Sequence, residues 1–259
     1  SSRRDLVRYS HAMDDAGWVA NHDGNLSVRI QPDRIVLTPT SFSKADVGLD
    51  DLVVVDGAGV KTGGRRRPFS ELVLHLAVYN DRPDVAAVVH AHPPYATAFG
   101  VAGRPLPHPF LPEAVVSLGA QIPTVPLTAP GALAVEALTP FIRRCDAVLL
   151  AGNGVLTWGP SIELAYLRME LTEHLAKIAH MAAPLGGPLP LPGDLVEALV
   201  EKRRKGGLAA PEEGSAHPSV PRKERMESAV ADRVVAGLPG ADAQTVARLA
   251  REILEGLKR

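Results

Sequence analysis

Two histidines separated by a single alanine, His90 and His92, have the types and spacing to do chemistry. They end an apolar run, VAAVV, and Pro93-Pro94 follows at once, which predicts a short buried strand that stops at the pair. Because alternate side chains of a strand share a face, both imidazoles point the same way across the small Ala91. This geometry suits chelation of one metal ion, although two solvated histidines at a strand end would show the same pattern.

Two other segments supply polar groups that could join the histidines. Pro68 opens a predicted helix on which Glu71 and His75, four residues apart, share a face. Gly24-Asn25 is a turn into an alternating strand, LSVRI. The hydroxyl-rich segment TPTSFSK follows the next strand as a loop. These segments offer a carboxylate and a loop suited to an anion.

The rest of the pattern sets the fold class. Apolar runs predict strands at 34–37, 52–55, 123–126, 146–150 and 155–158, and helical periodicity predicts helices at 5–16, 131–143 and 160–181. On the last helix we expect an apolar stripe of Leu164, Leu167, Leu171, Leu175 and Ile178. Hairpins and crossovers both occur, so we predict an α/β fold with a helix-flanked sheet that is not purely parallel.

The composition changes after residue 183. A proline and glycine linker, PLGGPLPLPG, leads into a predicted short helix at 194–205. A stretch rich in Pro, Glu, Ser and Gly at 207–221 precedes two further helical patterns, at 222–237 and 242–259. We therefore divide the chain into a domain at 1–183 and a linker with a helical C-terminal extension at 184–259.

Composition restricts the partners. The chain has 259 residues, of which 46% are apolar, so it can bury a sizeable core. A formal net charge of -1 gives no overall field for nucleic acid or an anionic membrane, and we expect neither as a partner. Cys145 is the single cysteine, which excludes an intrachain disulfide, and we see neither a signal peptide nor a spanning apolar run. We expect a cytoplasmic protein.

Seven motifs occur in order along residues 4–181: DGNLSVR, LTPTSFSKADV, DLVVVDGAGV, PFSELVLHLAVY, VVHAHPPYATAF, LPEAVVSLGAQIPTVPLTAPG and LLAGNGVLTWG. Their succession and spacing resemble the class II aldolase and adducin family, which includes sugar-phosphate aldolases, epimerases and dehydratases. The resemblance implies a three-layer α-β-α sandwich around a mixed, largely antiparallel sheet, with the C-terminal extension as a small helical appendage outside it. It also favours metal binding over solvated histidines at the central pair.

The resemblance implies catalytic roles for individual residues. His90 and His92 match the family's metal ligands, and Glu71 matches its acid/base residue. Glu113, in LPEAVV, falls where the dehydratase branch places its acid/base glutamate, although an exposed loop carboxylate would fit the same position.

The resemblance also implies a phosphate site. The positions that match it lie in the Gly-Asn turn, in the hydroxyl-rich loop and just before the glutamate: Gly24, Asn25, Thr40, Ser41 and Ser70. The chain has Phe69 where a second hydroxyl is common in the family, which lowers the expected affinity for phosphate.

The largest departure from the family lies in LLAGNGVLTWG, where Asn153 stands in place of the usual third histidine ligand. An amide oxygen is a harder donor than imidazole, so it lowers the affinity for zinc relative to that for manganese, iron or magnesium. Three outcomes are open: Glu71 completes a site with the two histidines, another histidine such as His22 or His108 reaches in, or the metal is lost. We expect one divalent ion, zinc first.

The implied activity is that of a metal-dependent lyase. It would act on a sugar phosphate or related hydroxyketone by aldol cleavage, through an enediolate that the divalent ion stabilises. Dehydration and epimerisation share that intermediate and remain alternatives. A non-catalytic, adducin-like oligomeric binding protein is the alternative from another class. The resemblance further implies a homotetramer with sites at subunit interfaces.

Overall fold

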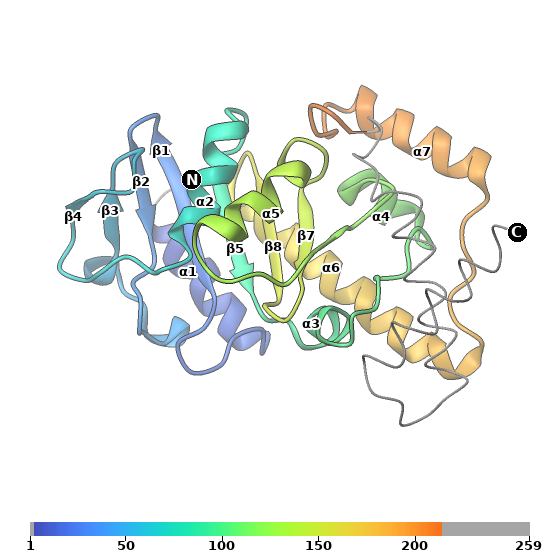
Figure 1. The fold of residues 1–259 in the computed structure, drawn as a ribbon, viewed down its shortest axis with the longest axis horizontal. Coiled ribbons are helices and arrows are strands. Elements are labelled where there is room, and N and C mark those ends of the chain that lie inside the picture. The colour runs from blue at the N-terminus through green and yellow to red at the C-terminus, as the bar shows by residue number, and fades with distance from the viewer. Residues whose placement is uncertain (1–2, 214–259) are drawn as a thin grey trace, which may run out of the picture. The chain divides into compact units, whose positions relative to one another are not determined.

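A mixed sheet with helices on both faces forms the centre of the structure, a computed structural model that describes residues 3–213 (Figure 1). The helices are α1 (Arg3–Asp15), α2 (Leu72–Asp81), α3 (Pro94–Val101), α4 (Pro112–Leu118), α5 (Ala132–Ile142), α6 (Ile162–Ala182) and α7 (Gly193–Lys205). The strands are β1 (Asn25–Gln31), β2 (Arg34–Leu37), β3 (Val53–Val55), β4 (Lys61–Gly63), β5 (Ala87–Ala91), β6 (Thr124–Val125), β7 (Ala147–Leu150) and β8 (Val155–Gly159). The predicted helices at 222–237 and 242–259 lie outside the described residues.

The strand order within the described chain is β4-β3-β2-β1-β5-β8-β7-β6. Only the β6–β7 pair of this sheet is parallel, and the other neighbours are antiparallel. This confirms the predicted mixed, largely antiparallel sheet. The central strand β5, which carries His90, lies between β1 and β8, and His90 pairs with Asn25 on one side and Leu156 on the other.

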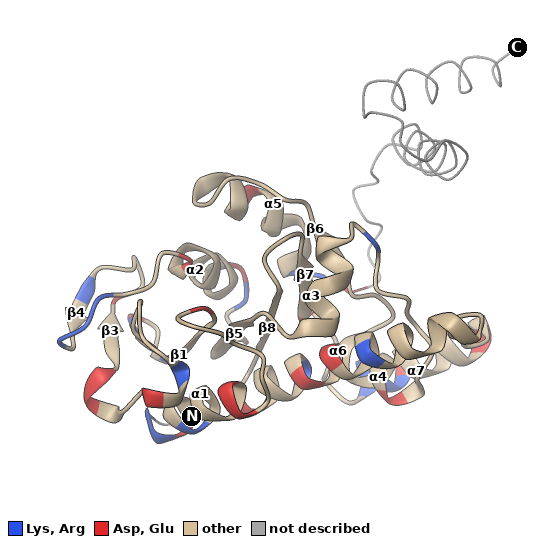
Figure 2. Cartoon of the chain, turned by 90° about the horizontal axis from the view of Figure 1, so that it is seen from below, with Lys and Arg blue, Asp and Glu red and all other residues tan. Residues whose placement is uncertain are grey.

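Alternate strand residues contribute to two separate cores. Val88 and Leu156 belong to the core with α2 and α5, whereas Val89 and Val155 belong to the core with α1 and α6. Figure 2 shows these two helix pairs on opposite sides of the sheet. The three-layer α-β-α arrangement is thereby confirmed. His90 has the parity of Val88, so it points to the face covered by α2.

The buried face of α6 differs from the predicted leucine stripe. Leu167 is 45% exposed, while Arg168 and Glu173 are buried. The reason is local pairing, because Glu173 accepts hydrogen bonds from the backbone N–H groups of Tyr95 and Ala96 at the first turn of α3. A carboxylate is favourable at a helix N-terminus, and hydropathy periodicity does not detect this gain.

Asp146, which is fully buried, forms salt bridges with arginines on three separate segments. Arg82 donates to its Oδ1 at 2.9 Å, Arg203 on α7 donates to its Oδ2 at 2.6 Å, and Arg168 on α6 pairs with Oδ2 at 2.9 Å. Arg203 also donates to the carbonyls of Val116 and Ser117 at the end of α4. The helix α7 therefore packs with the rest of the described chain in one compact unit. The domain boundary after residue 183 stays a prediction.

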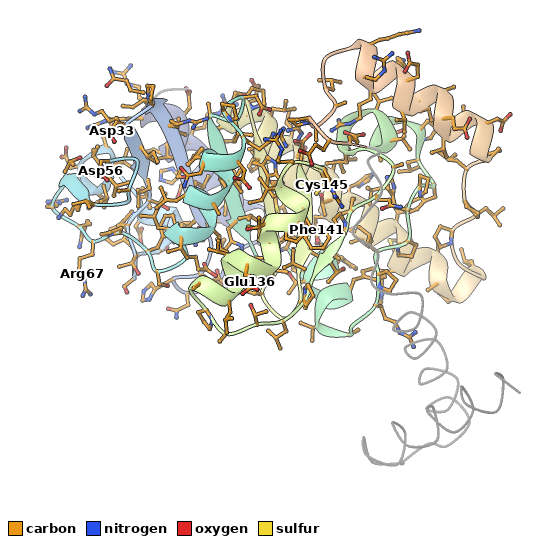
Figure 3. The ribbon with its side chains drawn as sticks, turned by 45° about the horizontal axis from the view of Figure 1, so that its top comes forward. Asp33, Asp56, Arg67, Glu136, Phe141 and Cys145 are labelled. Carbon is orange, nitrogen blue, oxygen red and sulfur yellow. The ribbon has the colours of Figure 1, made fainter. Side chains whose placement is uncertain are left out.

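Cys145 lies just after α5, one residue before Asp146 (Figure 3). Burial and the neighbouring Asp146 carboxylate raise the pKa of its thiol far above the ordinary value. Its Sγ donates to the carbonyl of Phe141 at 3.3 Å. The thiol is therefore protonated and packed, which makes it a structural group and not a nucleophile.

Among the described residues, no helix is both long enough and apolar enough to cross a membrane.

We predict that Asp146→Asn lowers the free energy of unfolding by roughly 3–5 kcal/mol, because it removes the buried anion that three guanidinium groups share. Arg82 and Arg203 keep Asp84 and Glu213 as partners, whereas Asp146 is the carboxylate that pairs with Arg168. Urea unfolding monitored by circular dichroism measures this change. Glu201→Gln is the matched control, since Glu201 pairs with Arg204 on an exposed helix face and should change little. Equal unfolding midpoints for both variants would contradict the assigned importance of Asp146.

Candidate active site

Four segments converge where β1 begins, β5 ends, α2 begins and β7 turns into β8. Asn25 is the first residue of β1, His92 follows the last residue of β5, and Asn153 lies in the turn between β7 and β8. Glu71 is the N-cap of α2 and precedes its first residue, so it is not on the helix as the sequence pattern predicted.

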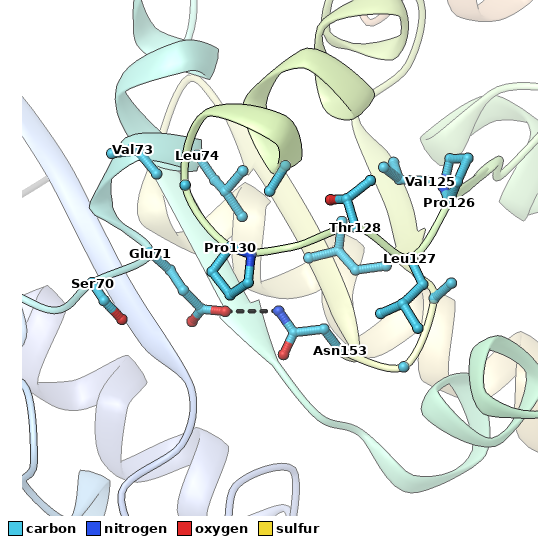
Figure 4. Close-up of a pocket in the computed structure, with 15 residues that line it drawn as sticks. Ser70, Glu71, Val73, Leu74, Val125, Pro126, Leu127, Thr128, Pro130 and Asn153 are labelled. Atoms are coloured by element: carbon cyan, nitrogen blue, oxygen red, sulfur yellow. Dashed lines mark hydrogen bonds between the residues drawn. The ribbon is translucent and has the colours of Figure 1, made fainter.

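Glu71 is the polar centre of this convergence. Asn25 Nδ2 donates to its Oε2 at 2.8 Å and Asn153 Nδ2 donates to its Oε1 at 2.7 Å (Figure 4). Burial alone would raise the pKa of Glu71, but His90 and the two amide donors outweigh it and lower that pKa to about 2. Burial also lowers the pKa of His90, which is therefore neutral at pH 7. The amide donors thus hold an ionised carboxylate at neutral pH.

The two imidazoles present the same nitrogen to the site. His90 Nδ1 donates to the carbonyl of Val155 at 3.0 Å, and His92 Nδ1 lies 3.1 Å from a carboxylate oxygen of Asp23. The ring centroids are 5.1 Å apart. Both Nε2 atoms are buried without a hydrogen-bond partner. Because Val155 can only accept, the proton of His90 is on Nδ1 and the lone pair of Nε2 is free to bind a metal.

These orphaned nitrogens fit a divalent ion, and the third donor is the open question. Within residues 3–213, no group of three His, Cys, Asp or Glu side chains is arranged to hold a metal. The oxygens of Glu71 are engaged by amide protons, although His90 Nε2 is only 3.4 Å from Oε2. Asn153 directs its amide nitrogen, which is not a ligand, toward Glu71. The donor set therefore supplies two imidazole ligands with a carboxylate beside them.

Of the two other histidines considered, His22 lies at the site and His108 does not. His22 lines the same cavity as His92. The ring of His108 instead bonds the carbonyl of Gly119 through Nε2 at 2.8 Å.

A polar cavity of about 240 Å³ gathers most of the predicted site residues. It is lined by His22, Asp23, Gly24, Asn25, Pro39, Thr40, Phe69, Ser70, Glu71, His92 and Asn153. Gly24, Asn25, Thr40 and Ser70, which were predicted to bind phosphate, thus come together beside Glu71. Ser41 and Glu113 are not among its lining residues. Glu113 lies in the first turn of α4.

Gly24 and Gly154 allow the backbone to approach the histidines closely. Both have a positive φ, of +67° and +73°. A Cβ at Gly154 would lie 2.2 Å from the carbonyl oxygen of Ala91 and 2.5 Å from His92 Cδ2. A Cβ at Gly24 would lie 3.2 Å from the carbonyl oxygen of His90. A side chain at either position would displace the end of β5 that carries the two histidines.

Sequence reasoning missed Asp23 and Lys44. Asp23 was assigned no role from the sequence, but its carboxylate lies 3.1 Å from His92 Nδ1 and can orient that ring. Lys44 is buried, and its Nζ donates to the carbonyls of Phe42 at 2.8 Å and His22 at 3.4 Å, which fixes the loop that carries Asp23. Asp23 had a signal in HDGN, because a carboxylate directly before the predicted Gly-Asn turn can reach the same site. Lys44 had none, since lysines are rarely buried.

Behind the site, the core contains a buried polar chain. Ser27 Oγ lies 2.7 Å from His75 Nδ1 and 2.8 Å from the hydroxyl of Tyr79. Burial lowers the pKa of His75 to about 3, so the imidazole is neutral. His75 is therefore a packed, hydrogen-bonded group behind the glutamate.

His75 gives a pH prediction. Its pKa is about 3 when folded and near 6.5 when unfolded, so between these values only the unfolded chain binds its proton. Stability should therefore fall with acidification below pH 6.5, by about 1.4 kcal/mol per pH unit from this residue. His75→Gln should flatten that slope.

Urea unfolding of metal-free protein at pH 7.5, 6.5 and 5.5 measures the slope. His174→Gln, on an exposed position of α6, is the control and should keep the wild-type slope. An unchanged slope in His75→Gln would show that His75 is protonated in the folded protein.

Comparison with known proteins agrees with this geometry. Residues 4–180 match the family model described as the Class II Aldolase and Adducin N-terminal domain. The chain therefore belongs to the class II aldolase and adducin family, which confirms the resemblance found in the sequence.

Two of the relatives and one solved structure are sugar-phosphate aldolases. An L-fuculose phosphate aldolase of Methanococcus vannielii is 32% identical over 180 residues, which cover 69% of this chain and 95% of the relative. A 5-deoxy-D-ribulose 1-phosphate aldolase of Bacillus thuringiensis serovar kurstaki is 30% identical over 203 residues, covering 77% and 94%. The solved structure of an L-fuculose 1-phosphate aldolase matches with a TM-score of 0.72 at 28% identity, covering 78% of this chain and 95% of the other.

Proposed function

We propose that this protein is a metal-dependent lyase that splits a sugar phosphate or a related phosphorylated hydroxyketone by aldol cleavage. The observation that carries the proposal is the ionised Glu71 carboxylate, held beside two imidazoles whose Nε2 atoms have no other partner. Family membership and the named aldolase relatives support the same reaction class.

We assign each residue of the site a separate role. A divalent ion held by His90 and His92 would polarise the substrate carbonyl and stabilise negative charge on its oxygen. In cleavage, the hydroxyl beyond the scissile C–C bond loses its proton as that bond breaks, and the bonding electron pair passes to the carbon next to the carbonyl, which is then protonated. Glu71 is ionised at neutral pH, so it can accept the hydroxyl proton and deliver it to that carbon, and the reverse transfers accompany bond formation. The amides of Asn25 and Asn153 keep its carboxylate oriented.

The polar cavity is the proposed phosphate site. Gly24, Asn25, Thr40 and Ser70 line it, with Ser41 next in the loop. Phe69 has no hydroxyl to bind a phosphate. Its side chain is instead buried, with its ring centroid 5.0 Å from that of His75. Anchoring a remote phosphate there would orient the reacting end of the substrate against Glu71.

The alternatives have less support. Dehydration as in the family's other branch would use Glu113, which lies on α4 and lines neither described cavity of the site. Epimerisation shares the first proton transfer and differs in its later steps. A silent binding protein has no need of an ionised carboxylate beside two unpartnered imidazoles, since burying such groups costs stability.

We assign one divalent ion per chain, with zinc first and manganese, iron or magnesium as substitutes. Two imidazoles suit zinc, while the lack of a histidine at position 153 favours the harder ions. Asp23 should strengthen either choice, because a carboxylate on the far nitrogen of a ligating histidine raises its basicity.

The test of the function is cleavage by metal-loaded protein. Each divalent ion is restored to metal-free enzyme, and aldehyde release from ketose 1-phosphates is followed with a coupled reductase. Glu71→Gln should lower kcat by about 10²–10⁴-fold while metal content stays near one equivalent. His90→Ala should lose the metal itself.

Glu136→Gln, an exposed carboxylate on α5, is the control and should behave as wild type. Metal binding without cleavage or isomerisation of any ketose phosphate would favour the alternative of a non-catalytic binding protein. Absence of metal binding would contradict the proposed metal-dependent lyase.

Position 153 gives a second test. Asn153→His should raise zinc affinity tenfold or more, about 1.4 kcal/mol, by restoring a third imidazole at the family's position. Calorimetry with metal-free protein measures the gain, and Asn80→His on the exposed side of α2 controls for surface binding. Equal zinc affinity in both variants would mean that position 153 does not reach the ion.

We also propose a cytoplasmic homotetramer. The composition with one buried cysteine suits a reducing compartment. Exposed Leu127 and Val73 lie beside the site and offer apolar contact surface for a neighbouring subunit. Light scattering should give about four times the 27.4 kDa chain mass, and a monodisperse monomer at micromolar concentration would contradict the tetramer.

A further inference from the structure

Lys44 is a buried cation that has no role in the reaction proposed above. The residue is 1% exposed, and its Nζ donates to the carbonyls of Phe42 at 2.8 Å and His22 at 3.4 Å. Among the described residues no carboxylate forms a salt bridge with it, and the nearby Asp23 pairs with His92 instead. Because a buried charge loses its hydration, this arrangement is costly, and an anion held nearby would offset part of that cost.

The ammonium of Lys44 connects the two loops that form the polar cavity. His22 lines that cavity, and Phe42 lies two residues after Thr40, which also lines it. One side chain therefore bonds the main chain of the loop before β1 and that of the loop after β2. The carbonyl of Lys44 in turn accepts from Ser10 Oγ on α1 at 3.1 Å. The cation is thus one hydrogen bond away from the lining of the proposed phosphate site.

The cavities beside Glu71 have no lysine or arginine among their lining residues. The polar cavity carries the carboxylates of Asp23 and Glu71. A second cavity of about 390 Å³ shares Glu71 and Asn153 with it, is otherwise mainly apolar, and also lacks both residue types (Figure 4). A phosphate dianion in the polar cavity would therefore face two carboxylates, and a cation behind the lining would reduce this repulsion.

Resting on the lyase function proposed above, we propose that Lys44 is a positioning residue for the substrate phosphate. Its two hydrogen bonds fix the distance between the loops whose polar groups bind the phosphate, and its charge attracts the dianion across the cavity lining. Burial lowers the pKa of Lys44, whereas the carboxylates of Asp23 and Asp14 oppose that shift. A bound phosphate would favour the charged form further.

Inorganic phosphate is the first probe, because its binding to the metal-free protein does not depend on catalysis. Lys44→Met removes the charge and keeps a long apolar side chain, so the Kd for phosphate, measured by calorimetry, should rise about tenfold or more. Lys44→Arg keeps the charge and should retain part of the affinity. Ser10→Ala is the matched control, because it removes the hydrogen bond to the carbonyl of Lys44 but leaves the ammonium, and it should keep the wild-type Kd.

Cleavage by the metal-loaded variants separates anchoring from a general loosening of the site. In Lys44→Met the KM for a ketose 1-phosphate should rise about tenfold while kcat changes less, because the lost interaction lies away from the reacting atoms. The kcat/KM for the same ketose without its phosphate should equal the wild-type value. A merely structural lysine would instead lower kcat/KM for both compounds.

Equal phosphate Kd in Lys44→Met and wild type, or equal losses in Lys44→Met and Ser10→Ala, would overturn the inference while leaving the lyase intact. Weaker phosphate binding in Lys44→Met, together with no cleavage by the wild type, would support the role of Lys44 and contradict the proposed lyase. Absence of phosphate binding by the wild type would overturn the inference. Failure of both Lys44→Met and Lys44→Arg to fold would also overturn it, since the lysine would then be required by the fold itself.

Discussion

The ionised carboxylate of Glu71 is the constraint on which the site depends. It is partly buried at the N-cap of α2, where an ionised carboxylate would be unfavourable without hydrogen-bond donors. Asn25 from β1 and Asn153 from the β7–β8 turn supply them, so one side chain ties together three segments far apart in the sequence. The strand order then sets the geometry, because β5 runs between β1 and β8 and brings His90 against the same carboxylate.

Two buried polar clusters, one uncharged and one made of ion pairs, stabilise the elements around this site. Behind it, Ser27, His75 and Tyr79 form a buried, uncharged polar chain under α2. Farther away, Asp146 joins Arg82, Arg168 and Arg203 and fixes α6 and α7 to the end of the sheet. The removal of such a buried anion is costly, so the arrangement of the helices is specified by charge pairing as well as by apolar packing.

Local patterns predicted the parts of this structure that depend on periodicity. The shared face of His90 and His92 follows from strand alternation, and the mixed sheet follows from its hairpins and crossovers. The burial of Arg168 was not predictable, because its partner Asp146 is distant in sequence. A hydropathy pattern assigns every charged side chain to the surface. The N-cap position of Glu71 was missed for a related reason, since Pro68 suggested a helix start several residues too early.

Asn153 shows why a departure from a family pattern has to be judged by its contacts. In the sequence it is only a missing imidazole, which argues against a metal enzyme. In the structure its amide donates to Glu71 at 2.7 Å and keeps that carboxylate charged and oriented. A neutral imidazole bound to a metal through its acceptor nitrogen would not donate from that atom. At this position the chain therefore has a hydrogen-bond donor to Glu71 where the family has a histidine, and the amide supports the carboxylate that we propose as the acid/base group.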